Sequence, residues 1–167
     1  FGKLYALRSL PGGSSLCVFD MQSEISGTVT LDVLTPKAEF KTPGEHSCYI
    51  TILEHQAVLA DYTSGTLSLF ELDVDGMPVG EPELIRFEGC GPDPVRQTSP
   101  HIHSSWVSPD GKSIVVVDLG CDKIYRYAVS DGRLDAGTQE TFDLPSGCGP
   151  RHCTFNQEGT RLYVATE

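Results

Sequence analysis

The sequence predicts an all-β fold built from repeated antiparallel units. No window of the 167 residues shows a sustained apolar pattern at helical spacing, whereas short apolar runs bounded by Gly, Pro, Asp and Ser recur along the chain. In addition, a strand-turn-strand pattern occurs three times, and successive copies start roughly fifty residues apart.

The expected strands are separated by segments rich in turn-forming residues. PGGS at 11–14 joins the first two strands. SPDG at 108–111 forms a tight turn, because Pro presets φ, Asp bonds its own backbone and Gly accepts positive φ. In chain order, the predicted strands are residues 1–6, 16–19, 27–34, 48–53, 57–60, 67–72, 83–87, 114–117 and 123–129.

The repeat predicts the architecture. Residues 48–61, 105–118 and 153–166 keep the strand-turn-strand outline, and each copy runs over the same thirteen steps. A period near fifty residues with about four short strands is typical of β-propeller blades. The predicted division is a part blade at 1–44, blades at 45–99 and 100–149, and a part blade at 150–167.

These make about three four-stranded antiparallel blades, fewer than the roughly four to eight of a closed ring. A half ring would leave sheet faces and edges uncovered. We therefore interpret the chain as part of a longer propeller that needs further blades, with a small stand-alone β-sandwich as the alternative.

Composition excludes several classes of partner. The net charge of −11 argues against general binding to nucleic acids or anionic membranes, which requires a basic surface. No apolar run approaches the ~20 residues of a membrane span, and the first residues lack a signal-peptide pattern. A cytoplasmic location is the default expectation, although a sequence that opens without Met leaves export of a parent protein open.

The six cysteines show no zinc-binding spacing, and free thiols are favoured over two or three disulfides. Two histidines, His101 and His103, lie two residues apart in an extended segment, so both imidazoles can face one site. With Asp118 or Glu167 they could chelate a metal, but neither spacing demands it. No metal or other cofactor is therefore predicted.

Six motifs occur in a specific order: GPDPVRQ at 91–97, PHIHS at 100–104, SPDGK at 108–112, DLGCDKIYRY at 118–127, GPRH at 149–152 and LYVATE at 162–167. Together they resemble the lactonase family of seven-bladed β-propellers, which includes propeller-type 6-phosphogluconolactonases and fungal 3-carboxy-cis,cis-muconate lactonizing enzymes. The resemblance covers residues 45–167. One departure is Asp61, which stands where the family usually has Asn.

The resemblance implies a polar site for a small anionic lactone. His103 would be the general base that activates water, Glu167 would orient it or share its role, and Arg151 would hold developing negative charge or a substrate anion. The residues expected nearby as substrate-binding groups are His101, Arg96, Gln97 and His152.

Each of these residues also has a structural interpretation. His103 could bond to a neighbouring loop, Arg151 could form a salt bridge between blades, and Glu167 could be an exposed strand end. Arg96 and Gln97 could serve merely to brace the long loop before the histidines. The leading expectation is a lactone hydrolase of the 6-phosphogluconolactonase type; a muconate cycloisomerase and a non-catalytic propeller that binds a protein or metabolite are the alternatives.

Overall fold

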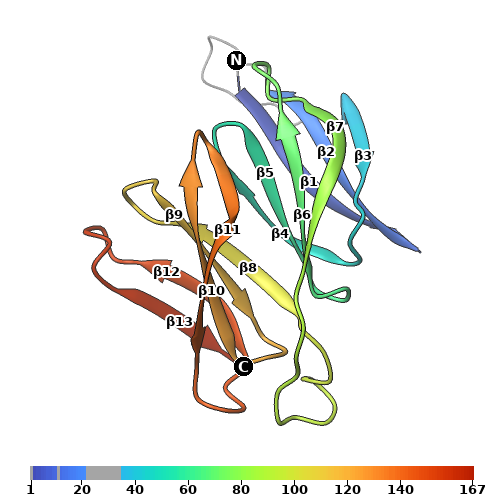
Figure 1. Ribbon diagram of the computed structural model, residues 1–167. Helices are drawn as coiled ribbons and strands as arrows, with labels where there is room; N and C mark the ends of the chain where they lie inside the picture. The colour runs from blue at the N-terminus through green and yellow to red at the C-terminus, as the bar shows by residue number, and fades with distance from the viewer. Residues whose placement is uncertain (1, 11, 22–34) are drawn as a thin grey trace, which may run out of the picture.

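Thirteen β-strands form the computed structural model, which describes residues 2–10, 12–21 and 35–167 (Figure 1). In chain order they are β1 (Gly2–Leu10), β2 (Gly13–Met21), β3 (Ala38–Lys41), β4 (Ser47–Ile52), β5 (Gln56–Asp61), β6 (Thr66–Leu72), β7 (Pro78–Arg86), β8 (Ile102–Val107), β9 (Ser113–Asp118), β10 (Lys123–Ser130), β11 (Arg133–Asp143), β12 (Pro150–Phe155) and β13 (Leu162–Thr166).

The strands form four antiparallel sheets in which each strand pairs with its neighbour in sequence. Two sheets have four strands, β4-β5-β6-β7 and β8-β9-β10-β11; they are flanked by the three-stranded β1-β2-β3 and the two-stranded β12-β13. Figure 1 shows the sheets side by side, like the blades of a fan. The predicted all-β fold of four-stranded antiparallel units is confirmed.

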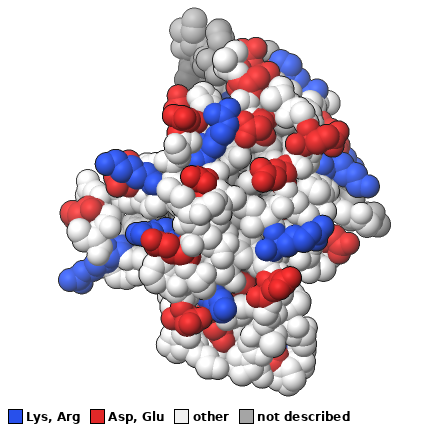
Figure 2. All heavy atoms as spheres, viewed as in Figure 1, with Lys and Arg blue, Asp and Glu red and all other residues white. Residues whose placement is uncertain are grey.

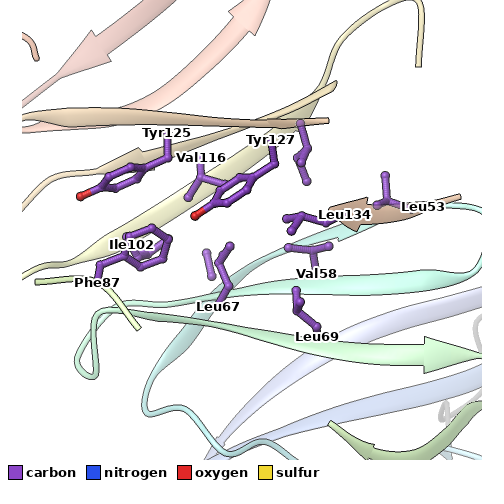
Figure 3. Packing of buried hydrophobic residues seen from close by; sticks show 12 residues of the cluster. Leu53, Val58, Leu67, Leu69, Phe87, Ile102, Val116, Tyr125, Tyr127 and Leu134 are labelled. Atoms are coloured by element: carbon purple, nitrogen blue, oxygen red, sulfur yellow. The ribbon is translucent and has the colours of Figure 1, made fainter. Parts of the chain in front are cut away.

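The core lies between the faces of neighbouring sheets, because successive residues of a strand point to opposite faces. On β5, Val58 packs toward the β8–β11 sheet, while Leu59 packs with Leu16 of β2 on the other side. On β9, Val116 joins the same cluster as Val58, whereas Val117 packs against Cys153 of β12. Figure 3 shows Val58 and Val116 within the central cluster. The second strand of each full sheet is therefore buried on both faces.

Two outer strands, β3 and β11, were not predicted. β11 is exposed along almost its whole length, with only Leu134 buried, so its sequence RLDAGTQETFD carries little apolar alternation. β3 has four residues and a short run of alternation. The predicted strand at 27–34 lies outside the described residues.

The strand registers correct the repeat at one place. Counting along the sequence aligned Cys48 with Ser105. The strand pairing shows instead that Ile50 is equivalent to Ser105, because the turn after β4 is two residues shorter than the turn after β8. We call β4, β8 and β12, the first strands of their sheets, the inner strands. Each inner strand begins with a β-bulge, and the bulged residues are Cys48, His103 and Arg151. These three residues occupy one equivalent position in consecutive sheets.

Replacing Leu67 with Ala should lower the free energy of unfolding by about 2–5 kcal/mol, because Leu67 is fully buried between the two four-stranded sheets. Val74→Ala is the control, since Val74 is 98% exposed and should change little. Urea unfolding of the full-length protein measures both. Equal stability of the two variants would contradict the packing described above.

Candidate active site

Two repeated backbone positions bring polar side chains to one end of the sheets. The first is the bulge at the start of each inner strand, which holds His103 and Arg151; a bulge re-aims its side chain relative to the regular pleat. The second position is the residue that directly follows β5, β9 or β13, the strand paired with the inner strand. Its backbone N–H donates to a carbonyl before the inner strand, at 3.1 Å for Tyr62, 3.0 Å for Leu119 and 3.0 Å for Glu167.

His103 is a neutral histidine in this arrangement. Its Nε2 accepts a hydrogen bond from Nε of Arg151 at 3.0 Å, which places the ring proton on Nδ1. Nδ1 is buried and has no partner among the described residues. Burial lowers the pKa of His103 below its ordinary value, and the neighbouring His152 and Arg151 lower it further. A neutral imidazole at neutral pH is the state that a general base requires.

Two guanidinium groups share one carboxylate beside this histidine. Arg96 Nη2 lies 2.6 Å from Glu167 Oε2, and Arg151 Nη1 lies 3.5 Å from Glu167 Oε1. Since His103 is neutral, the group carries one positive charge in excess, in a chain whose net charge is −11. Figure 2 shows acidic and basic side chains interspersed over the face in view. The paired arginines are thus a local feature that suits a small anion.

Aromatic rings complete the cluster. The ring of Tyr62 stacks on His101 with centroids 4.4 Å apart and meets His103 edge-on at 5.8 Å. His101 Nδ1 donates to the carbonyl of Tyr62 at 2.8 Å, and His103 meets His152 edge-on at 4.9 Å. The structure therefore brings together six of the seven residues singled out in the sequence: His103, Arg151, Glu167, His101, Arg96 and His152.

Gln97 lies apart from this cluster. It is only 2% exposed, and its amide nitrogen donates to Leu119 O at 2.8 Å and to Asp122 Oδ1 at 2.7 Å. Its amide oxygen accepts from the backbone N–H of Asp93 at 3.2 Å. In this conformation the side chain of Gln97 braces the loop that carries Arg96, which was the structural interpretation of this residue.

Asp61, the departure from the family pattern, also stays out of the cluster. It is fully buried and accepts hydrogen bonds from the hydroxyls of Ser47, Thr66 and Ser68. Burial raises its pKa. Its carboxyl group is therefore used inside the β4–β7 sheet rather than facing a ligand.

Two further neighbours of His103, Tyr62 and Cys48, were not predicted from the sequence. The Cys48 thiol contacts the carbonyl of His103 at 3.3 Å, and burial raises its pKa to about 11. The repeat carried the signal for Tyr62, which follows residues 48–61 as Glu167 follows residues 153–166. Cys48 occupies the bulge position of His103 and Arg151, which only the strand registers show.

A cavity of about 1210 Å³ lies at the other end of the sheets, between the turns after β4 and β6 and the strands β1 and β2. The lysines that line it, Lys3 and Lys37, both pair with Asp20. Glu54, Asp73 and Asp75 also line it, so acidic groups outnumber basic ones there, in contrast to the site of the arginines beside His103. We place the candidate site at the His103 end for this reason.

Neither a metal-binding cluster nor a membrane-spanning helix is present within residues 2–10, 12–21 and 35–167. No three His, Cys, Asp or Glu side chains there converge in a way that could hold a metal ion. No helix in that part of the chain is long and apolar enough to cross a membrane.

The four-stranded antiparallel sheets, packed face to face, define the chain as part of a β-propeller. A family model described as "Lactonase, 7-bladed beta-propeller" matches residues 3–167, so the chain belongs to this family. The resemblance seen in the motifs is confirmed, and the β-sandwich alternative is excluded.

Among its relatives, the chain is 35% identical over 126 residues to 6-phosphogluconolactonase of Bacillus subtilis strain 168, covering 74% of this chain and 35% of that protein. It is 28% identical over 169 residues to the uncharacterized protein YwcC of Lactococcus lactis, covering 99% and 46%. The crystal structure of a provisionally assigned 6-phosphogluconolactonase from Bacteroides fragilis superposes with a TM-score of 0.86 at 31% identity, covering 99% and 47%. The chain thus spans less than half the length of these relatives, about three blades of such a ring.

Replacing Arg151 with Met should raise the pKa of His103, because the variant removes a neighbouring positive charge and frees Nε2. The pKa should stay below the ordinary value of about 6.5, since burial remains. NMR titration of the histidine side chains measures it. The control is Arg126→Met, which removes an exposed arginine paired with Glu140 on the outer strands. The same His103 pKa in both variants would contradict the contact.

Gln97→Ala should lower the free energy of unfolding by about 1–3 kcal/mol, because it leaves the buried acceptors of Leu119 and Asp122 with fewer donors. Val95→Ala is the control in the same loop, since Val95 is 80% exposed. Chemical unfolding of the full-length protein is the measurement. If Gln97→Ala were as stable as the control, the bracing role would be wrong.

Proposed function

We propose that the full-length protein carrying this chain is a lactone hydrolase that acts on 6-phosphogluconolactone. The observation that carries the proposal is a neutral, half-buried His103 whose Nε2 lies 3.0 Å from Arg151, beside a second guanidinium on Arg96. The names of the Bacillus and Bacteroides relatives support the same substrate. In this proposal the protein works in the cytoplasm, in the pentose phosphate route.

The proposed chemistry begins with an anion contacting the arginines. In the unliganded cluster the lone pair of His103 Nε2 is occupied by the Arg151 N–H. When the guanidinium of Arg151 turns to the substrate, Nε2 becomes free to accept a proton from water. The charge of the bound anion then offsets the positive charge that had lowered the pKa of His103. Substrate binding therefore makes the base available.

The free imidazole takes a proton as the water oxygen attacks the lactone carbonyl carbon. Arg151 donates hydrogen bonds to the oxyanion that forms, while Arg96 holds the phosphate, which lies at the other end of the sugar from the carbonyl. Collapse of the tetrahedral intermediate breaks the ring C–O bond, and the imidazolium of His103 returns its proton to the leaving oxygen. His103 is then neutral again, and the product is an open-chain acid.

Glu167 sets the charge of the proposed site. Its carboxylate lies between Arg96 and Arg151, so it holds both guanidiniums near His103 while leaving one positive charge in excess. A substrate phosphate or carboxylate takes up that charge and competes with Glu167 for hydrogen bonds. Further blades of the full-length protein close the ring around this cluster in the proposal.

The test is hydrolysis of freshly generated 6-phosphogluconolactone by the full-length protein, measured against its spontaneous decay. His103→Ala should reduce kcat/KM by about 100- to 10,000-fold, the usual contribution of a general base. The control is His55→Ala, because His55 is a half-buried histidine in the turn at the other end of β4, away from His103. It should leave the rate unchanged.

The acid limb of the kcat/KM profile should have an apparent pKa below about 6.5, since the pKa of His103 is lowered and the base is lost only when it protonates. A folded full-length protein that does not accelerate the decay would overturn the hydrolase proposal. Unchanged activity of His103→Ala would reject His103 as the base.

A further inference from the structure

Tyr62 joins the candidate site from a sheet that holds none of the other candidate residues. It follows β5 directly, in the turn between β5 and β6, whereas His103 begins β8 and Arg151 lies on β12. Its backbone N–H is bonded to the carbonyl of His46 at 3.1 Å, and the next N–H, of Thr63, to that of Glu45 at 3.2 Å. The backbone that carries the phenol ring is therefore held on a rigid part of the sheet.

The ring itself is oriented by two histidines. It lies nearly parallel to His101, with an interplanar angle of 9°, and almost perpendicular to His103, with an angle of 87°. Stacked and edge-on geometries are the favoured arrangements of such rings. Since these contacts involve only the ring, a phenylalanine at position 62 would keep them.

The hydroxyl of Tyr62 has a donor to spare. Its oxygen lies 3.5 Å from Arg96 Nη2, and a guanidinium can only donate, so the oxygen accepts in this contact. Among the described residues nothing accepts the hydroxyl proton. The same Arg96 nitrogen lies 2.6 Å from the Glu167 carboxylate. The unused O–H therefore lies next to the Arg96 guanidinium of the anion site.

The repeat gives independent support. Tyr62 and Glu167 follow the second strands of their sheets and make the same backbone hydrogen bond. Leu119, at the equivalent position between them, is 1% exposed and packed in the interior. Of the three described copies of this position, the two with polar groups both contact Arg96.

We propose that Tyr62 is a further substrate-binding residue, whose hydroxyl donates a hydrogen bond to the anionic group held by Arg96. This assignment rests on the proposed function for the identity of the ligand, a phosphorylated sugar acid or its lactone. The ring holds His101 and borders His103, and the hydroxyl adds one neutral donor to the charged ones. Tyr62 thus contributes to binding rather than to proton transfer.

The experiment compares Tyr62→Phe with the unmodified full-length protein, using 6-phosphogluconate as the probe and titration calorimetry as the measurement. Loss of one hydrogen bond to a charged group should weaken binding about ten-fold. The pKa of His103, followed by NMR, should be unchanged because the ring contacts remain. Tyr163→Phe is the matched control; Tyr163 is 55% exposed on β13, and its loss of a hydroxyl should not alter binding.

Equal affinity of Tyr62→Phe and the unmodified protein would overturn the proposal. A shifted His103 pKa together with weaker binding would also overturn it, since the hydroxyl would then act by positioning the histidine. Absence of probe binding in the unmodified protein would reject the anion site and Tyr62 together. Weaker binding in the variant, with no lactone hydrolysis by any form, would uphold Tyr62 and reject only the hydrolase function.

Discussion

Burial of β5 and β9 on both faces is the constraint on which the rest of this structure depends. A strand in the middle of the molecule packs against a neighbouring sheet on each of its two faces. β5 and β9 do so because their alternate side chains lie in different hydrophobic clusters. This arrangement leaves the strand ends and turns as the places where polar chemistry can be carried. The faces are occupied by packing, so function is confined to the rim.

The bulges then decide which side chains reach the rim. A regular strand would place the residues around His103 in strict alternation between the two packed faces. The extra residue at the start of each inner strand interrupts that alternation, so His103 and Arg151 leave the packing scheme and meet at 3.0 Å across two sheets. The contact between them is thus a result of backbone pairing as much as of side-chain chemistry.

Much of this could be predicted from the sequence. The apolar runs at 57–60 and 114–117 indicated the buried strands, because burial on both faces produces continuous apolar runs. The motif resemblance identified six residues that the structure gathers into one cluster. β11 could not be found in this way, since an exposed outer strand needs no apolar pattern.

The interior role of Gln97 was also beyond the sequence. An amide in a Gly- and Pro-rich loop serves equally well for a ligand or for backbone carbonyls, and only the fold shows that Leu119 and Asp122 take its hydrogens. Tyr62 was hidden for a different reason. Its relation to Glu167 is one of position within the repeat, which says nothing about contacts, and only the fold shows that both side chains reach Arg96.

The two repeated rim positions have a consequence for how such a protein diversifies. Cys48, His103 and Arg151 differ in charge, size and chemistry, yet their sheets keep the same pairing around them. Tyr62, Leu119 and Glu167 show the same tolerance. Evolution can therefore exchange the chemistry of the site one blade at a time, while the scaffold that positions it is inherited unchanged.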